Sequence, residues 1–185
     1  WLQWRRDQVT SLVRRVYLSA IALKPALKMS AATITWTPSP TSYSQWLTSA
    51  AYSKVLQDWR GWMEEGLLDL NIPMAYFRQE QNAADWANWS RFAKENRYGR
   101  HLALGVGAYF NTVSNSLVQM SSTRQAAGAA GPAEGVVCYS YAVLAKSGVP
   151  RSEFLQALTG PSVHHPNADA LFPAPAIPQG MPWKT

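Results

Sequence analysis

The sequence predicts an α/β fold in which strand–helix units follow one another along the chain. Four apolar runs alternate with segments whose apolar side chains recur at the i, i+3, i+4 and i+7 spacing of an amphipathic helix. No two of these runs lie close enough in sequence to form a hairpin, so neighbouring strands are expected to be parallel and joined by helices. The chain has 185 residues, of which 47% are hydrophobic and 15% charged, which is enough apolar material to bury a core.

The predicted strands are continuous apolar runs, as is typical of parallel strands that are buried on both faces. They cover residues 29–36, 67–77, 101–110 and 134–141. Pro73 lies inside the second run and cannot donate to a sheet, so we expect it at a strand end or a bulge. Gly105 and Gly107 lack the third glycine of a dinucleotide-binding loop, so they indicate close packing within the third strand.

Amphipathic segments predict the helices around these strands. They cover residues 5–24, residues 52–65, a segment with Asp85 as N-cap, a segment capped by Asn111 or Thr112, and residues 151–158. Pro25 ends the first helix and Gly66 the second, because proline breaks a helix and glycine favours its C-terminal turn. Residues 37–44 are rich in Pro, Ser and Thr and predict a loop.

The number of units favours part of a larger barrel. A (β/α)₈ barrel has eight strands and takes about 250 residues, so four parallel units are half of one. A doubly wound sheet is the alternative. We predict a fragment in which residues 1–145 form the C-terminal half of a TIM barrel, with the N-terminal half missing. Residues 146–185 are expected to form a short helix and a proline-rich connector towards a missing downstream module. Open sheet edges predict that the isolated chain is poorly soluble or oligomeric.

Charge and composition argue against several classes of partner. The formal net charge is +6, but the basic residues are scattered or lie on the polar side of the first helix, as expected of Arg5, Arg6, Arg14 and Arg15. We therefore expect no nucleic-acid partner. No run approaches the roughly 20 apolar residues of a membrane span. Cys138, the single cysteine, is expected to be a buried thiol, and the spacing of ligand-type residues indicates neither a metal nor a cofactor.

Aromatic side chains stand at the carboxyl ends of all the predicted strands, which is where parallel α/β folds bind their ligands. They are Trp36, Tyr76, Phe77, Tyr109, Phe110, Tyr139 and Tyr141, with Arg78 beside them. Aromatic faces stack on the C–H faces of sugar rings, and a few polar groups then bind the hydroxyls. The set is equally compatible with a sugar-binding site and with rings that cap the barrel core. Alternation places Tyr139 and Tyr141 on one face of their strand.

Carboxylates are scarce at these strand ends. Glycoside hydrolysis usually needs two carboxylates that flank the scissile bond. Of the 11 acidic residues, Glu80 alone is expected in a loop that follows the carboxyl end of a strand. Glu80 is therefore the one catalytic candidate, and a surface glutamate is the simpler interpretation. The fragment is expected to shape a sugar cleft without completing the chemistry alone.

Several segments resemble a known family in order and spacing. The segment WMEEG (62–66) leads directly into the pattern Asp69-x-x-x-Pro73-x-x-Tyr76, and further similar segments cover residues 4–25, 58–78, 102–111 and 134–141. Over about residues 1–145 the chain is similar to the bacterial glycosyl-hydrolase-like 10 family of (β/α)₈ proteins. The resemblance implies the last four barrel strands, with the family's acidic residues on the earlier strands. It also implies an extracytoplasmic location, in the periplasm, the envelope or the exterior.

One position departs from the family pattern. Many members have a glutamine where this chain has Pro73-Met74, so this chain lacks that hydrogen-bonding group, whereas Tyr76 matches. The first hypothesis is a glycoside hydrolase that acts on a polysaccharide or oligosaccharide, with its carboxylates mostly outside the fragment. Its binding residues would be Trp36, Tyr76, Arg78, Tyr109, Tyr139 and Tyr141. The second hypothesis is a non-catalytic carbohydrate-binding barrel of the cell envelope. A complete small α/β domain that binds a phosphorylated ligand lacks the glycine-rich loop it would need.

Overall fold

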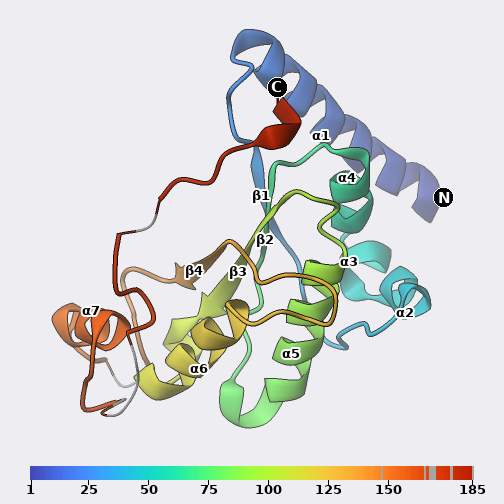
Figure 1. Ribbon diagram of the computed structural model, residues 1–185. Helices are drawn as coiled ribbons and strands as arrows, with labels where there is room; N and C mark the ends of the chain where they lie inside the picture. Colours follow the sequence, from blue (N-terminus) through green and yellow to red (C-terminus); the bar gives the residue numbers. More distant parts are fainter. Residues whose placement is uncertain (147, 165, 167–169, 176, 185) are drawn as a thin grey trace.

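The computed structural model describes residues 1–146, 148–164, 166, 170–175 and 177–184. Within these residues, one parallel sheet of four strands has the order β1-β2-β3-β4 (Figure 1). The strands are Ser30–Thr33, Leu70–Pro73, His101–Gly107 and Gly135–Tyr139. Each strand pairs in parallel with the one before it. This consecutive order is the arrangement of half a (β/α)₈ barrel, because a doubly wound sheet reverses its order at a switch point.

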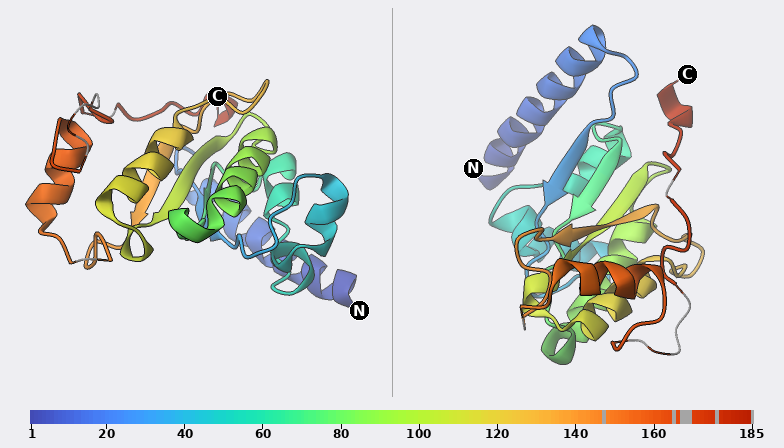
Figure 2. Two further views of the ribbon diagram at one scale, coloured as in Figure 1. Left: turned by 90° about the horizontal axis from the view of Figure 1, so that it is seen from below. Right: turned by 90° about the vertical axis from the view of Figure 1, so that its left-hand side faces the viewer.

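Helices alternate with the strands and cover one face of the sheet (Figure 2). They are α1 (Leu2–Leu23), α2 (Tyr43–Thr48), α3 (Ala50–Ser53), α4 (Trp59–Glu65), α5 (Gln79–Glu95), α6 (Val113–Thr123) and α7 (Arg151–Thr159), with 3₁₀ turns at Ala108–Phe110 and Pro182–Lys184. Thr112 caps α6, as predicted, through a hydrogen bond from the Asn115 amide to its hydroxyl. Pro73 is the last residue of β2, which confirms its expected place at a strand end.

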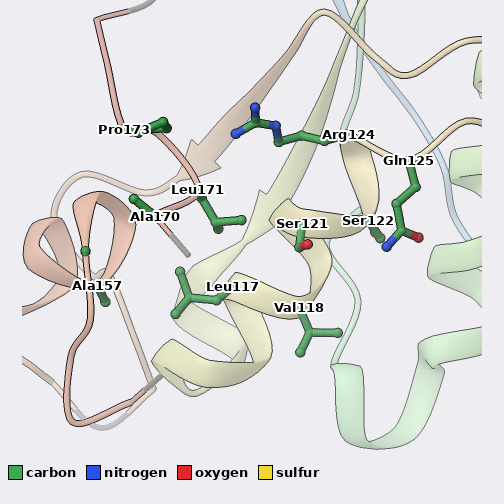
Figure 3. A pocket seen from close by; sticks show the side chains of 11 residues that line it. Leu117, Val118, Ser121, Ser122, Arg124, Gln125, Ala157, Ala170, Leu171 and Pro173 are labelled. Carbon is green, nitrogen blue, oxygen red and sulfur yellow. The ribbon is translucent and has the colours of Figure 1, made fainter. Parts of the chain in front are cut away.

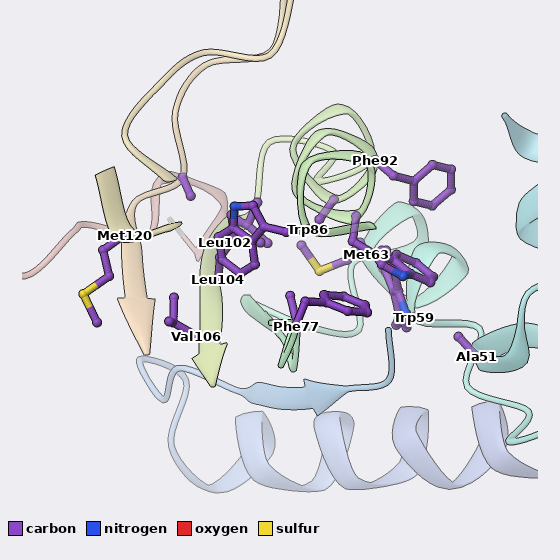
Figure 4. Close-up of a cluster of buried hydrophobic side chains, with 14 of the residues drawn as sticks. Ala51, Trp59, Met63, Phe77, Trp86, Phe92, Leu102, Leu104, Val106 and Met120 are labelled. Carbon is purple, nitrogen blue, oxygen red and sulfur yellow. The ribbon is translucent and has the colours of Figure 1, made fainter. Parts of the chain in front are cut away.

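The core lies between the sheet and its helices (Figure 4). Rings from α2, α4 and α5 form its densest part: the centroid of Trp46 lies 4.6 Å from that of Trp59 and 5.5 Å from that of Phe92. Five of the nine tryptophans are buried, namely Trp46, Trp59, Trp62, Trp86 and Trp89. The high tryptophan content of the chain therefore mostly serves packing.

The two faces of the sheet differ in exposure. Leu102, Leu104 and Val106 of β3 point toward the helices and are fully buried. On the edge strands, alternate residues are exposed on the opposite face, as Ala32 of β1 and Val137 of β4 show. A closed barrel would bury this second face in its interior. The open face is therefore the concave side of a half barrel.

Two predicted helices begin elsewhere. The helix expected over residues 52–65 is divided between the end of α3 and α4, because Leu56 adopts a left-handed φ of 61° that interrupts the helical path. Asp58 then caps α4 by accepting a hydrogen bond from the Gly61 amide. The next helix, α5, begins at Gln79 rather than after Asp85, and Asp85 accepts a hydrogen bond from the Ser39 amide instead.

One arginine of the first helix is not on its polar side. Arg6 is 6% exposed and lies 3.5 Å from the centre of the Tyr52 ring, and its Nε donates to the Tyr52 carbonyl. Arg14, in contrast, pairs with Glu65 at the surface. The expectation that all of these arginines form one solvated face is therefore wrong for Arg6, because a guanidinium satisfied by a ring and a carbonyl can be buried.

The segment after α7 returns to the sheet. In Figure 1 it runs from α7 back to the N-terminal ends of the strands, where the 3₁₀ turn Pro182–Lys184 lies. The Nε1 of Trp183 donates to the Asp69 carboxylate at 2.8 Å, and the Lys184 ammonium lies 2.7 Å from the same carboxylate. α7 itself contributes Phe154 to the core. The described part of the C-terminal segment is therefore packed on the fold.

Candidate functional site

Three tyrosines from consecutive strand ends meet at the carboxyl edge of the sheet. Tyr76 and Tyr139 stack with ring centroids 5.1 Å apart and an interplanar angle of 19°. Tyr109 meets both rings edge-on, at 6.3 Å from Tyr76 and 5.7 Å from Tyr139. We call these residues the tyrosine cluster. The structure thus brings together three of the aromatic residues that the sequence singled out.

Glycines in β3 make room for this arrangement. A Cβ on Gly105 would lie 2.8 Å from the Pro73 carbonyl oxygen and 3.2 Å from the Tyr76 ring. A Cβ on Gly107 would lie 3.0 Å from the Tyr76 Cβ. Both distances are shorter than ordinary contacts, so any larger residue would push Tyr76 away from the strand. The predicted close packing at these two glycines is confirmed.

The surroundings of Tyr76 and Tyr109 in the cluster favour the neutral phenol. Burial raises the pKa of Tyr76 above its usual value, and the neighbouring Tyr139 and Tyr109 phenols raise it further. Burial, followed by the Tyr139 phenol, likewise raises the pKa of Tyr109. In the described part of the chain, none of the three hydroxyls hydrogen-bonds to another protein group. The three hydroxyls are thus available as hydrogen-bonding groups beside aromatic faces.

A hollow of about 460 Å³ opens next to the cluster. Its walls come from the ends of β1, β2 and β3: Ile34, Thr35, Trp36, Met74, Tyr76, Phe77, Tyr109 and Phe110. Trp36 is 53% exposed, so part of its ring remains open to solvent. Arg78 is exposed and lies 5.2 Å from the centre of the Phe110 ring, and it makes no ion pair with any described residue. None of the lining residues carries a carboxylate.

Tyr141 stands apart from this site. It is 73% exposed and follows the end of β4 at Tyr139, so strand alternation does not extend to it. The Arg151 guanidinium lies 3.8 Å from the centre of its ring. The expectation that Tyr139 and Tyr141 share a face of one strand is therefore wrong, because the strand ends two residues earlier.

Glu80 lies in the first turn of α5 and not in the predicted loop. The Lys146 ammonium is 3.1 Å from each of its carboxylate oxygens, and the Asn115 side chain donates to Oε1 at 3.2 Å. The helix starts this early because the Gln79 amide, which would otherwise lack a partner, donates to the side chain of Asn111. Glu80 thus links the loop after β2 to the loop after β4.

Asn111 and Gln119 are buried polar residues that sequence reasoning did not assign to the site. Asn111 was considered only as a helix cap, yet it is 1% exposed and binds backbone groups of the β2–α5 loop. Gln119 is fully buried and donates to the Phe77 carbonyl at 3.1 Å. The sequence signal for Asn111 was its position directly after Tyr109 and Phe110 at a strand end.

Other groups of the chain do not extend the site. Burial raises the pKa of the Cys138 thiol to about 11, so it is no nucleophile at neutral pH. Within the described residues there is no group of three His, Cys, Asp or Glu side chains that could hold a metal ion, and no helix is long and apolar enough to cross a membrane. A second hollow, of about 630 Å³, lies between α6, α7 and the C-terminal segment, with Leu117, Ala157 and Leu171 among its walls (Figure 3).

The architecture is that of a partial (β/α)₈ barrel, with parallel βα units in barrel order and a hollow at the carboxyl ends of the strands. The chain belongs to the glycosyl hydrolase-like 10 family, whose model matches residues 1–123. It is also similar to the protein named Glycosyl hydrolase YngK of Bacillus subtilis (strain 168), with 31% identity over 116 residues. That match covers 57% of this chain and 22% of the relative, so the chain spans about a fifth of its length.

The family match ends where α6 ends, at Thr123. It includes Trp36, Tyr76, Arg78, Glu80 and Tyr109, whereas Tyr139 and Tyr141 follow it. The predicted resemblance to this family is confirmed, and the matched range is shorter than the expected one. These findings establish the family and the fold of the chain.

Proposed function

We propose that this chain forms the sugar-binding side of a glycoside hydrolase that acts on a polysaccharide or oligosaccharide. The observation that carries the proposal is the tyrosine cluster beside an open hollow, at the edge of the sheet where barrel enzymes bind substrates. Family membership and the relative named as a glycosyl hydrolase support the reaction class.

Each residue has a distinct part in the proposal. The rings of Tyr76, Tyr109 and Trp36 offer apolar faces to sugar rings, and the phenol hydroxyls donate to sugar oxygens. Arg78, which is exposed and without an ion-pair partner among the described residues, donates to hydroxyls or to a carboxylate of the substrate. Tyr139 supports Tyr76 by stacking on it.

The proposal places the acid and base on strands that precede this chain in the complete barrel. No carboxylate lines the hollow, and Glu80 is already bound by Lys146 and Asn115. Glycoside hydrolysis usually needs two carboxylates that flank the scissile bond. The same proposal includes an extracytoplasmic location, which fits a polymeric carbohydrate substrate.

A second function is favoured by the same lack of carboxylates. A non-catalytic carbohydrate-binding barrel would keep the tyrosine cluster and would need no acid or base at all. The two functions differ in one measurement, the release of reducing ends from a polysaccharide that the protein binds.

The test is affinity electrophoresis of the full-length protein through gels that contain soluble bacterial, plant or fungal polysaccharides. We expect retardation by at least one polymer, and Tyr76→Ala to weaken it by about tenfold or more, since aromatic contacts of this kind contribute on the order of 1–3 kcal/mol. Tyr43→Ala is the matched control, because Tyr43 is 56% exposed on α2 and lies outside the cluster.

The outcomes separate the alternatives. Retardation that depends on Tyr76, together with release of reducing ends, supports the hydrolase. Retardation without any release supports the binding barrel. If no polymer retards the wild-type protein, or if Tyr76→Ala behaves like Tyr43→Ala, the sugar-binding role of the cluster is wrong.

A further inference from the structure

Asn111 is a buried side chain whose hydrogen-bonding atoms all have partners. It follows the 3₁₀ turn after β3 and is 1% exposed. Its Nδ2 donates to the Phe77 carbonyl at 2.9 Å and to the Gly107 carbonyl at 3.1 Å. Its Oδ1 accepts from the Gln79 amide at 2.8 Å. Each polar atom of this buried amide already has a protein partner, so its role is exerted through the segments that it holds.

Those segments come from three neighbouring strand ends. Phe77 belongs to the β2–α5 loop, which also carries Tyr76 and Arg78, and Gln79 is the first residue of α5. Gly107 is the last residue of β3, and Tyr109 follows it. The backbone carbonyl of Asn111 also accepts from the Lys146 amide at 2.9 Å, in the segment after β4. One residue thus joins the segments that follow β2, β3 and β4, the strands at whose carboxyl ends the three tyrosines lie.

The β2–α5 loop depends on these bonds for its position. Beyond Met74, its amides form only short-range turn bonds: Ala75 to Pro73, Tyr76 to Met74, and Phe77 to Ala75. Gln119 adds a second restraint, because its Nε2 donates to the Phe77 carbonyl at 3.1 Å and to the Gln79 side chain at 3.2 Å. A loop without ladder bonds opens locally at low free-energy cost unless side chains hold it.

We propose that Asn111 is a positioning residue that fixes the stacking of Tyr76 on Tyr139 by holding the β2–α5 loop against β3, with Gln119 as its support. The inference rests on the proposed sugar-binding function. Asn111 acts through Tyr76 and does not touch the sugar itself.

The experiment combines hydrogen exchange with a double-mutant cycle in the full-length protein. In Asn111→Ala, the peptide over residues 74–82 should exchange at least about tenfold faster, since the Gln79 amide loses its acceptor. Retardation by the polysaccharide that the wild type binds should weaken by about tenfold or more. In a Tyr76→Ala background, the same substitution should change retardation by less than about twofold, because the ring it positions is absent.

Asn96→Ala is the matched control. The Asn96 side chain also makes two hydrogen bonds, with Phe92 and Arg60, but at the opposite end of α5. It should lower stability without changing exchange at residues 74–82 or sugar binding. Gln119→Met serves if Asn111→Ala does not fold, because it keeps the volume, removes the bond to the Phe77 carbonyl and should produce a smaller effect of the same kind.

Three results would overturn the inference. The first is unchanged exchange at residues 74–82, and the second is unchanged retardation despite faster exchange. The third is an equal loss of retardation with and without Tyr76, which would mean that Asn111 acts by another route. If the wild type binds no polysaccharide, the proposed function fails and the inference falls with it, whereas binding that survives Asn111→Ala overturns the inference alone.

Discussion

At the N-terminal ends of the strands, the Asp69 carboxylate is fully buried and both of its oxygens have partners. At the carboxyl ends, the phenols of the tyrosine cluster have no hydrogen-bond partner among the described residues. The Asp69 carboxylate accepts from the Met29 amide at 2.7 Å and from Trp183, and it pairs with Lys184. β2 thus begins at a closed ionic cluster on one side of the sheet, whereas β2, β3 and β4 end in open aromatic faces on the other. Barrel proteins in general keep stability at the first end and ligand binding at the second.

The substitution with the largest expected effect removes Asp69 from the buried ionic cluster. Asp69→Ala leaves Lys184, which is 9% exposed, without its counter-charge, and breaking a buried pair of this kind costs about 3–5 kcal/mol. We expect a lower midpoint in urea unfolding of the full-length protein. Glu65→Ala is the control, because Glu65 pairs with Arg14 at the surface, and its midpoint should hardly move. Equal effects of the two substitutions would remove the distinction between buried and exposed pairs.

The same carboxylate predicts how stability depends on pH. Burial alone would raise the pKa of Asp69, but hydrogen bonds from Lys184, the Met29 amide and Trp183 outweigh it and hold the pKa below its usual value. The contribution of Asp69 is therefore complete above the usual carboxyl range and is lost as the pH falls through the lowered pKa. Unfolding midpoints measured between neutral and acidic pH should fall less steeply in Asp69→Ala than in the wild type. Parallel curves would contradict the assignment.

A change at the other end should affect binding more than stability. Gly105→Ala places a Cβ 2.8 Å from the Pro73 carbonyl and against the Tyr76 ring, at a cost of about 1–3 kcal/mol if the loop must shift. We expect weaker polysaccharide retardation in the folded variant. Gly135→Ala is the control, since its Cβ would meet only Ala103, at an ordinary 3.5 Å. Retardation that is equal in the two variants would show that Tyr76 tolerates displacement.

Glu80→Gln has the smallest expected effect on stability. It tests whether Glu80, at the carboxyl edge of the sheet, has a structural or a catalytic role. The pair with Lys146 is partly exposed on both sides, so its loss should cost about 0.5 kcal/mol or less. If Glu80 only ties two loops together, hydrolysis of a bound polysaccharide by the full-length protein should change by less than about threefold. A fall in kcat of about a hundredfold or more would instead make Glu80 a catalytic residue.

Much of the fold was predictable because its signals are local. Apolar runs, helical periodicity and the absence of hairpins led to the parallel sheet in consecutive order, and Thr112 and Pro73 occupy their expected places. The starts of α4 and α5 were not predictable in this way. Leu56 is held in a left-handed conformation, and Gln79 finds its acceptor on Asn111, which is 32 residues away in sequence.

The kinds of residue in the site were predictable from the sequence, whereas the exact set of residues was less so. The rule that parallel strands bind ligands at their carboxyl ends located Tyr76, Tyr109 and Tyr139, which do meet. The same rule included Tyr141, because the sequence does not show that β4 ends at Tyr139. The contact of Trp183 with Asp69, at the opposite ends of the strands, has no signal in the sequence.

The contact between Trp183 and Asp69 joins residues that are 114 positions apart. Contacts of such long range form late, because the loop they close must lose its entropy before the contact stabilises anything. During synthesis, the β2 region emerges from the ribosome well before Trp183 and Lys184 do, so Asp69 has to remain hydrated in the meantime. The Asp69 carboxylate therefore gains its Trp183 partner only once a residue 114 positions further along the chain has been synthesised.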